Sequence, residues 1–336
     1  MNDTQYQCSQ HIKIAQSGLG DRLTMMVFNS NFTEFDEFNA FAAEWDIDFR
    51  QVSRGSLNAS LVQVMTNNHS ISRARFDQLT YQQGAAVPNM RTFAFLDASA
   101  SDVDWCGFTF SPDSIAIFAR DRDFRCVSPS GFFVYTLSFT EEELAAASNR
   151  LGIPNICDRL NAHAEIRKID RRSINLLCKT VNETITSVLT SGESVFVREK
   201  SRGFPKEQIA EQLVLVLTTA DSVTGHPSPN KLTAATNRTL QYIEAHLADR
   251  PTIRDLSKVA GVSRRTLEYA FRRQLDISPK SFMNQQRLTL VRRDLRKLSA
   301  KKSISDIANR WGYWHMGQFA RDYQRQFGEL PSYTVR

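Results

Sequence analysis

The amino-acid sequence predicts an α+β protein with a β-rich N-terminal part, a helical segment and an all-α C-terminal part. Three observations lead to this prediction. Short apolar runs typical of strands recur over residues 46–139, a helical pattern is duplicated near the C-terminus, and the net charge changes sign between these regions. The chain has 336 residues, enough for two to three domains, and its 41% of hydrophobic residues is ordinary for a globular protein.

We interpret residues 1–160 as the β-rich domain. Near its start, apolar residues follow a helix-like spacing at Phe35, Phe38, Phe41, Ala42 and Trp45. Short runs then alternate in part between apolar and polar residues and are bounded by Gly, Pro, Asn and Asp, which predicts a β-sandwich or barrel. The runs are residues 46–52, 56–66, 72–83, 91–97, 107–112, 114–122, 123–129 and 131–139.

Aromatic residues in these runs have two interpretations. They could line an apolar pocket, or they could be plain core, as aromatic strand residues more often are. The residues concerned are Phe93, Phe95, Trp105, Phe108 and Phe110. No effector-binding residue is assigned from the sequence.

Motifs for metal, cofactor and catalytic chemistry are not found. The six histidines lie far apart without an H-x-H pair, and no P-loop, G-x-S-x-G or H-E-x-x-H occurs. We therefore expect no metal, no cofactor and no enzymatic activity. No run of 18 apolar residues and no leader pattern is seen, so we expect a protein of the cytoplasm with no membrane partner.

The five cysteines are odd in number, widely scattered and without a C-x-x-C motif. They are Cys8, Cys106, Cys126, Cys157 and Cys178. This pattern is typical of buried thiols in a reducing compartment. A DNA-repair enzyme would need a reactive cysteine in a basic, partly exposed setting, and none of the five lies among clustered Arg or Lys.

Two apolar helices are predicted between residues 161 and 220, one over 164–190 and one over 205–220. They could simply cover the sheet, or they could form a dimer interface. The candidate interface residues on the first helix are Ile174, Leu177, Val181, Ile185 and Val188. Residues 221–231 are rich in Pro, Gly and Ser and are interpreted as a linker.

The charge distribution separates the residues before and after this linker. Residues 232–336 contain 20 Lys and Arg against 9 Asp and Glu, a net charge of +11, whereas residues 1–231 have a net charge of −5. A basic module on a mildly acidic body favours a polyanionic partner for the module, although a solvated basic surface has the same composition.

Residues 252–282 and 303–333 repeat one another. Ile253, Leu256 and Gly261 recur 51 residues later, whereas Leu267, Phe271, Leu275 and Pro279 recur 52 residues later, so the second copy has one extra residue in its turn. Each glycine follows an apolar helix, where a left-handed residue ends the helix. Ser263 is a natural N-cap for the next helix. Each copy is therefore predicted to be a helix-turn-helix, and a long helix from about Pro279 to Ser299 joins the two.

The residues that carry this pattern resemble the DNA-binding domain of the AraC/XylS transcription regulators. They are Ala260-Gly261-Val262-Ser263, Leu267, Phe271, Pro279, Arg287, Ile307-Ala308, Gly312-Tyr313, Phe319, Tyr323, Phe327-Gly328 and Pro331. The resemblance covers residues 232–336, and two stretches look closest to regulators of ethanolamine utilisation. It departs from the family pattern at Thr334, where an arginine is expected after the aromatic residue.

The resemblance implies roles for side chains of the second helix of each motif. Arg pairs with guanine, Gln with adenine and Glu with cytosine, which suits several of these positions to base reading. Expected base contacts are Arg265, Glu268, Tyr269, Met316, Gly317, Gln318 and Arg321. Expected phosphate contacts are Arg264, Arg272, Arg287 and Arg325.

The resemblance also implies a cupin-like jelly roll for the N-terminal domain, a helical dimer contact and a small-molecule effector. The sequence thus predicts a homodimeric, sequence-specific DNA-binding regulator, nucleoid-associated and most simply an activator that contacts RNA polymerase. Each subunit would read two adjacent major grooves of double-stranded promoter or operator DNA. An effector-free regulator, whose N-terminal domain is only a dimerisation and protein-interaction platform, is the alternative.

Overall fold

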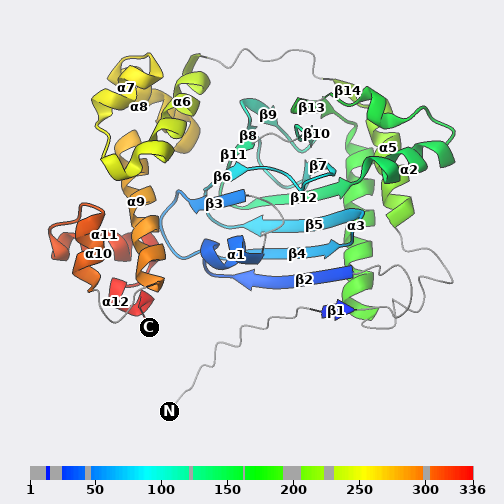
Figure 1. Ribbon diagram of the computed structural model, residues 1–336. Coiled ribbons are helices and arrows are strands. Elements are labelled where there is room, and N and C mark those ends of the chain that lie inside the picture. Colours follow the sequence, from blue (N-terminus) through cyan, green and yellow to red (C-terminus); the bar gives the residue numbers. More distant parts are fainter. Residues whose placement is uncertain are drawn as a thin grey trace.

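A computed structural model describes residues 13–15, 25–41, 47–120, 124–161, 163–191, 206–222, 231–297 and 303–335. A β-rich part with helices along one side lies next to a group of helices formed by the C-terminal residues (Figure 1). This is the α+β architecture that the sequence predicts. Among the described residues, no helix has both the length and the apolar character that a bilayer crossing requires.

Two antiparallel sheets form the β-rich part. The larger sheet has, in spatial order, strands β1 (Lys13–Ala15), β2 (Met25–Phe32), β4 (Ala59–Met65), β5 (His69–Phe76), β12 (Phe132–Phe139), β7 (Arg91–Leu96), β10 (Ser114–Ile117), β13 (Glu165–Lys168) and β14 (Asp221–Ser222). The smaller sheet has strands β3 (Ile47–Gln51), β6 (Thr80–Gly84), β11 (Phe124–Ser128), β8 (Val103–Trp105) and β9 (Phe108–Phe110).

Side chains of the larger sheet alternate between two cores. On β7, Phe93 and Phe95 point to one core together with helices α2 (Glu141–Arg150), α3 (Arg171–Ser191) and α5 (Lys206–Thr219). Ala94 and Leu96, on the opposite face of β7, belong to the core between the two sheets, to which helix α1 (Phe35–Phe41) contributes. The period of two along a strand explains this division.

Several sequence-based boundaries need correction. Residues 164–190 are not one helix, because 165–168 form β13 and α3 begins only at Arg171. The run 72–83 is divided by a turn into β5 and β6, and Cys106 lies in the turn between β8 and β9 with a φ of 54°. Cys8, Ala42, Trp45 and residues 223–230 of the predicted linker lie outside the described residues.

The five candidate dimer residues also need correction. Ile174, Leu177, Val181, Ile185 and Val188 are all buried, and four of them pack in the core between the sheet, α2 and α5. Their side chains therefore cover the subunit's own sheet and are not available to a second subunit. Of the two interpretations of this apolar stripe, cover for the sheet of the same chain is the one that the structure has.

The C-terminal residues form a compact set of helices on two small cores. The helices are α6 (Lys231–His246), η2 (Leu247–Asp249), α7 (Ile253–Ala260), α8 (Arg264–Leu275), α9 (Pro279–Arg296), α10 (Ile304–Arg310), α11 (Met316–Phe327) and α12 (Pro331–Thr334). One core joins α6, η2, α7 and α8 to the first half of α9, and the other joins α10 and α11 to its second half. Helix α9 is thus the predicted connecting helix, and α6 adds a helix that the sequence patterns did not identify.

Candidate nucleic-acid interface and ligand cavity

In the first helix-turn-helix, α7 and α8, local hydrogen bonds define the beginning of α7, the turn and the beginning of α8. A capping box between Thr252 and Asp255 begins α7. Gly261 ends it with a φ of 66°, and the amide of Val262 donates to a carbonyl of α7 five residues earlier at 3.2 Å. Ser263 then caps α8, because its hydroxyl accepts the backbone N–H of Thr266.

The second helix-turn-helix, α10 and α11, repeats this construction with two differences, in the length of the turn and in the cap of its second helix. A capping box between Ser303 and Asp306 begins α10, and Gly312 has a φ of 89°. The amide of Tyr313 donates five residues back at 2.9 Å, as Val262 does in the first copy. The turn is one residue longer, as the sequence repeat predicts, and α11 starts after His315 without a side-chain cap.

The polar face of α8 contains four of the predicted DNA contacts. Arg264, Arg265 and Tyr269 are exposed, and Tyr269 shows 56% of its surface to solvent. Glu268 is half-buried and pairs with Arg264 at 3.0 Å across one helical turn. The opposite face of α8 is buried in the first core, so this polar face is free to meet a partner.

On α11 the exposed face contains Gly317, Gln318 and Arg321, with Arg325 one turn further. The amide of Gln318 donates to Asp322 at 2.9 Å, and its oxygen accepts from Arg321 at 3.1 Å. A side chain added at Gly317 would meet nothing within 4 Å, which leaves room for another molecule to approach the backbone. Met316 is half-buried against the second core.

The two remaining predicted phosphate contacts differ in their setting. Arg272 is exposed on α8. Arg287 is half-buried on α9, where burial lowers the pKa of its guanidinium, and its Nε has no partner. Tyr313, whose hydroxyl donates to the Asn284 carbonyl at 3.1 Å, lies in the same seam between α9 and the second motif. This places Arg287 between helices, and its role as a phosphate contact stays a prediction.

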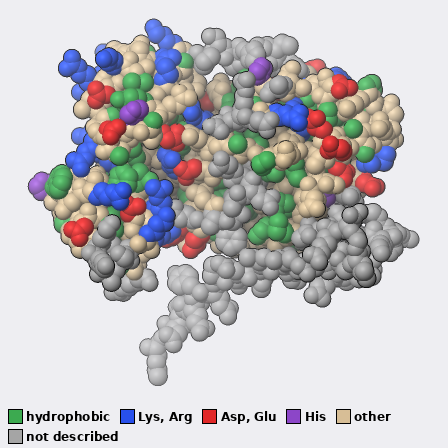
Figure 2. All heavy atoms as spheres, viewed as in Figure 1, with side chains coloured by type: hydrophobic (Ala, Val, Ile, Leu, Met, Phe, Trp, Pro, Cys, Tyr) green, Lys and Arg blue, Asp and Glu red, His purple; other side chains and the backbone are tan. Residues whose placement is uncertain are grey.

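Lys and Arg side chains gather over the C-terminal helices, with fewer Asp and Glu among them (Figure 2). The acidic side chains at the recognition helices are largely held by basic neighbours, as Arg264 holds Glu268 and Arg325 lies 3.6 Å from Asp322. The face is therefore electropositive with ordered side chains, which suits a polyanion.

The second motif and the half of α9 that packs on it contact the β-rich part through ion pairs of α9 and through Gln326 of α11. The amide nitrogen of Gln326 donates to the Ser53 carbonyl at 3.0 Å, and its backbone carbonyl accepts from the Gly55 N–H at 3.0 Å. Glu34, just before α1, pairs with Arg292 and Arg296 of α9. Arg292 also contacts Glu329 at 3.0 Å and lies 4.5 Å from the ring centre of Phe327. Since Glu34 and Arg292 are 258 residues apart, sequence patterns gave no signal for this contact.

The first motif meets the β-rich part mainly through apolar groups. Tyr81 of β6 packs edge-to-face on Phe282 of α9 with ring centres 6.0 Å apart, and Val52 belongs to the same core. Arg50 of β3 adds an ion pair to Glu244 of α6 at 3.3 Å. The smaller sheet thus contacts the C-terminal helices directly.

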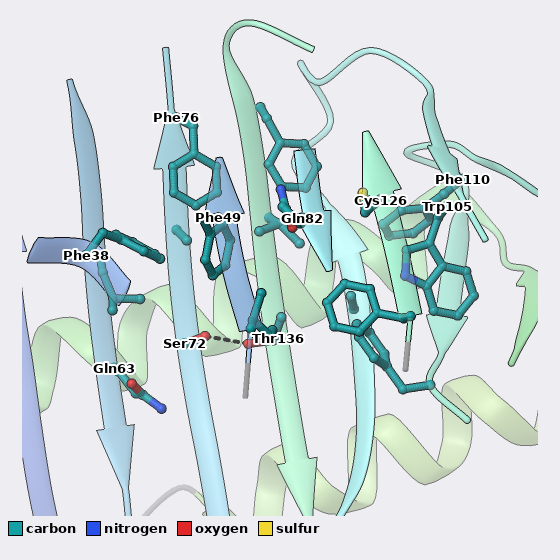
Figure 3. Close-up of a pocket in the computed structure, with 18 residues that line it drawn as sticks. Phe38, Phe49, Gln63, Ser72, Phe76, Gln82, Trp105, Phe110, Cys126 and Thr136 are labelled. Carbon is teal, nitrogen blue, oxygen red and sulfur yellow. Dashed lines mark hydrogen bonds between the residues drawn. The ribbon is translucent and has the colours of Figure 1, made fainter. Parts of the chain in front are cut away.

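A cavity of about 70 Å³ lies between the two sheets. Trp105 and Phe110, two of the five aromatic residues considered from sequence, line it, whereas Phe93 and Phe95 face the helices and Phe108 packs beside the same core without lining the cavity. Polar residues of the lining, which the sequence did not single out, come from neighbouring strands (Figure 3). These are Gln63, Ser72, Gln82, Cys126 and Thr136.

The four described cysteines are poor nucleophiles in their present settings. Burial raises the pKa of Cys106 and Cys157 to about 11 and that of Cys178 to about 12, and it also raises the pKa of Cys126. These thiols stay protonated at neutral pH, in contrast to a reactive cysteine. Within the described ranges, no group of three or more His, Cys, Asp or Glu is arranged to hold a metal ion.

Residues 256–336 match a family profile described as a helix-turn-helix domain. The chain is 34% identical over 98 residues to the probable thc operon regulatory protein of Rhodococcus erythropolis, covering 29% of this chain and 30% of that protein. It is 36% identical over 100 residues to the XylDLEGF operon transcriptional activator of Pseudomonas putida, covering 30% and 31%. The chain thus aligns with about a third of the length of these relatives.

Among solved structures, the AraC-like transcriptional activator CuxR is similar with a TM-score of 0.42 and 13% identity, covering 79% of this chain and 94% of that one. The sequence matches support the resemblance of the C-terminal residues to AraC/XylS-type regulators, and the relatives named are regulators of transcription rather than enzymes.

Proposed function

We propose that this protein is a sequence-specific DNA-binding regulator of transcription that acts as an activator in the cytoplasm. The observation that carries the proposal is the repeated construction of α7–α8 and α10–α11, which exposes the polar face of α8 and of α11. A helix of this kind enters the major groove of double-stranded DNA. Two such helices suit two grooves on one side of the duplex, about 34 Å apart. As an activator it would contact RNA polymerase.

Base reading is assigned to the exposed faces of the two recognition helices. On α8 we propose Arg265, Glu268 and Tyr269, and on α11 Met316, Gly317, Gln318 and Arg321. Arg264, Arg272, Arg287 and Arg325 are proposed to hold phosphates. The exposure of Arg265, Gln318 and Arg321 supports these roles, because each can reach a partner without disturbing a core.

The test is a matched pair of substitutions measured on DNA selected from a random pool by the unchanged protein. Arg321→Ala should cost about 1–3 kcal/mol and flatten the preference at one base position. Arg310→Ala removes the same charge from exposed α10 and should change affinity for selected and scrambled DNA alike. If Arg321→Ala weakens binding to the selected and to the scrambled DNA equally, Arg321 does not read a base.

A homodimer is proposed through the outer faces of α3 and α5. With the stripe of α3 buried, the available apolar side chains are Leu176, which is 53% exposed, and Leu215, which is 48% exposed. Leu176→Lys with Leu215→Lys should lower the mass measured by sedimentation to that of one subunit. If the unchanged chain already sediments as one subunit at micromolar concentration, the dimer is refuted.

Control by a small effector is proposed to act through α1. Phe38 of this helix lines the cavity, and Glu34 at its start pairs with α9. An occupant that displaces Phe38 would disturb the Glu34 ion pairs and so favour one arrangement of the two parts over another. Glu34→Gln should therefore change DNA affinity without any effector, whereas an unchanged affinity would favour the platform alternative.

The finer resemblance to regulators of ethanolamine utilisation makes ethanolamine one molecule to test. It is a cation at neutral pH, and the side chains that line the cavity include no carboxylate to pair with it. A thermal-shift titration of the full chain with ethanolamine tests this branch directly.

A further inference from the structure

We propose that the cavity between the two sheets binds an uncharged molecule of about one ring, which accepts a hydrogen bond from the indole N–H of Trp105. This deepens the proposed effector control and rests on it for its regulatory meaning. Binding itself is measured without DNA.

The lining excludes charged ligands. Of its 18 side chains, none is Asp, Glu, Lys, Arg or His, and most are aromatic or aliphatic. Burying an ion without a partner of opposite charge costs far more than burying a neutral polar group. A carboxylate or an ammonium ion would have no partner of opposite charge among these residues, whereas a hydroxyl or carbonyl would need only one hydrogen bond.

Among the buried side-chain nitrogen and oxygen atoms of the lining, only Nε1 of Trp105 has no hydrogen-bond partner. The amide nitrogen of Gln63 donates to Ser70 at 2.9 Å, and that of Gln82 donates to Ser128 at 2.5 Å. Ser72 bonds to Thr136 across neighbouring strands, as Figure 3 shows. Trp105, in contrast, is 2% exposed and its Nε1 has no partner.

The position of Trp105 suits this donor to a ligand in the cavity. Figure 3 shows the indole nitrogen on the side of the ring that faces the other lining side chains. Phe118 packs on the indole edge-to-face with ring centres 5.2 Å apart and fixes the plane of the ring. A buried N–H without an acceptor is costly, so a ligand oxygen that accepts from it gains stability that water outside the protein does not provide.

The size of the space limits the ligand. An engineered cavity of about 150 Å³ in another protein holds benzene, and the cavity here has about 70 Å³. A single ring therefore fits only with small movements of the surrounding rings, such as that of Phe38 on α1. A second fused ring is too large.

The test uses three probes with the same ring and different charge, added to the full-length protein at pH 7. We expect benzyl alcohol to raise the melting temperature in a concentration-dependent way, and benzoate and benzylamine to leave it unchanged. Benzyl alcohol should also shift one indole N–H signal in the nitrogen–proton spectrum, and this signal is assigned by its loss in Trp105→Phe.

Two variants separate the hydrogen bond from packing. Trp105→Phe should weaken the binding of benzyl alcohol about three- to tenfold. The binding of toluene, which has no hydrogen-bond acceptor, should not change. The matched control is Trp314→Phe, because Trp314 is 64% exposed in the turn of the second motif. Trp314→Phe should change the affinity for neither benzyl alcohol nor toluene. If Trp105→Phe does not fold, the indole signal of Trp105 is assigned by elimination from the signals lost in Trp45→Phe, Trp311→Phe and Trp314→Phe, and the shift in the unchanged protein then decides.

Each of the other possible outcomes refutes one part of the proposal or all of it. Equal binding of benzoate or benzylamine overturns the exclusion of charge, and binding without a shift of the Trp105 signal overturns the hydrogen bond. Absence of binding by benzyl alcohol overturns the proposal as a whole. None of these results touches the reading of DNA, which Arg321→Ala tests separately.

Discussion

The two helix-turn-helix motifs of this chain have the same plan but secure their second helix differently. In the first, Ser263 caps α8 with a side-chain hydrogen bond. In the second, the turn is longer, α11 has no side-chain cap, and Gly312 lies against the guanidinium of Arg250, which also stacks 5.6 Å from the ring centre of Trp314. The comparison teaches that one duplicated pattern can be held by a local bond in one copy and by packing in the other.

The motifs also differ in how they meet the β-rich part. The first does so mainly through apolar contacts around Tyr81, whereas next to the second the ion pairs of Glu34 with Arg292 and Arg296 of α9 are joined by hydrogen bonds between Gln326 of α11 and the backbone of Ser53 and Gly55. Salt screens exposed ion pairs but hardly affects apolar contacts. The side chains of Glu34, Arg292 and Arg296 are only 12–25% exposed, so salt screens these pairs weakly, and their contribution is tested better by changing a charge than by adding salt.

The largest expected effect tests whether the two cores are independent. Phe319→Ala empties a fully packed position in the second core and should cost about 3–5 kcal/mol. Hydrogen exchange should show lost protection in α10 and α11 while α7 and α8 keep theirs. The exposed Gln324→Ala on the same helix serves as the control. Equal loss of protection in both motifs would mean that they share one core.

The next largest effect is expected when the glycines of the two turns are replaced and the losses in free energy of unfolding are compared. Gly261→Ala should cost about 1–2 kcal/mol, because alanine is strained at a positive φ. Gly312→Ala should cost more, since its new methyl group would also lie 3.0 Å from Arg250. Urea unfolding of the two variants measures the difference. Equal losses would show that Arg250 moves away freely.

A smaller effect concerns the helix starts. Ser263→Ala should destabilise α8 by about 1 kcal/mol. His315→Ser should instead stabilise α11, by supplying the side-chain acceptor that this start lacks. Amide exchange at the first turn of each helix gives the readout. A loss of protection in α11 of the serine variant would contradict the comparison.

The smallest effect depends on pH. Hydrogen bonds from Thr252 hold the pKa of Asp255 below its usual value, so the carboxylate stabilises α7 above the ordinary aspartate pKa, and this contribution is lost as the pH falls through the lowered value. Asp255→Asn should therefore lower the melting temperature at pH 7 but not in strong acid. Asp249→Asn, at an exposed position, is the control. If Asp255→Asn still lowers the melting temperature in strong acid, the effect comes from packing and not from the charge.

Local patterns predicted the motifs well, because a glycine at positive φ and an apolar helical period are properties of a few neighbouring residues. Gly261, Gly312 and Ser263 have the predicted roles, and the extra residue lies in the predicted turn. Helix α6 was missed although its buried residues Thr236, Leu240 and Ile243 follow a helical spacing. They lie before the first repeat and outside the duplicated pattern.

Other features could not be predicted from the sequence, because an apolar pattern shows that a face is buried but not what it packs against. The apolar stripe of α3 predicted a buried face, and nothing in its spacing separates a sheet from a second subunit. Phe95 and Trp105 look alike as strand aromatics, yet Phe95 points from the larger sheet to the helices, whereas Trp105, on β8 of the smaller sheet, points into the core between the sheets. The contact of Glu34 with Arg292 depends on the whole fold.

Helix α9 contributes to both small cores, with Phe282 and Met283 in the first and Leu288, Val291 and Leu295 in the second. One continuous helix thus fixes the rotation of one helix-turn-helix motif against the other. Inserting a single residue between these groups would turn the second motif by about 100° and advance it by about 1.5 Å. If the proposed function holds, the spacing between the two groups of bases that the protein accepts depends on the length of α9, a helix to which no base contact is assigned.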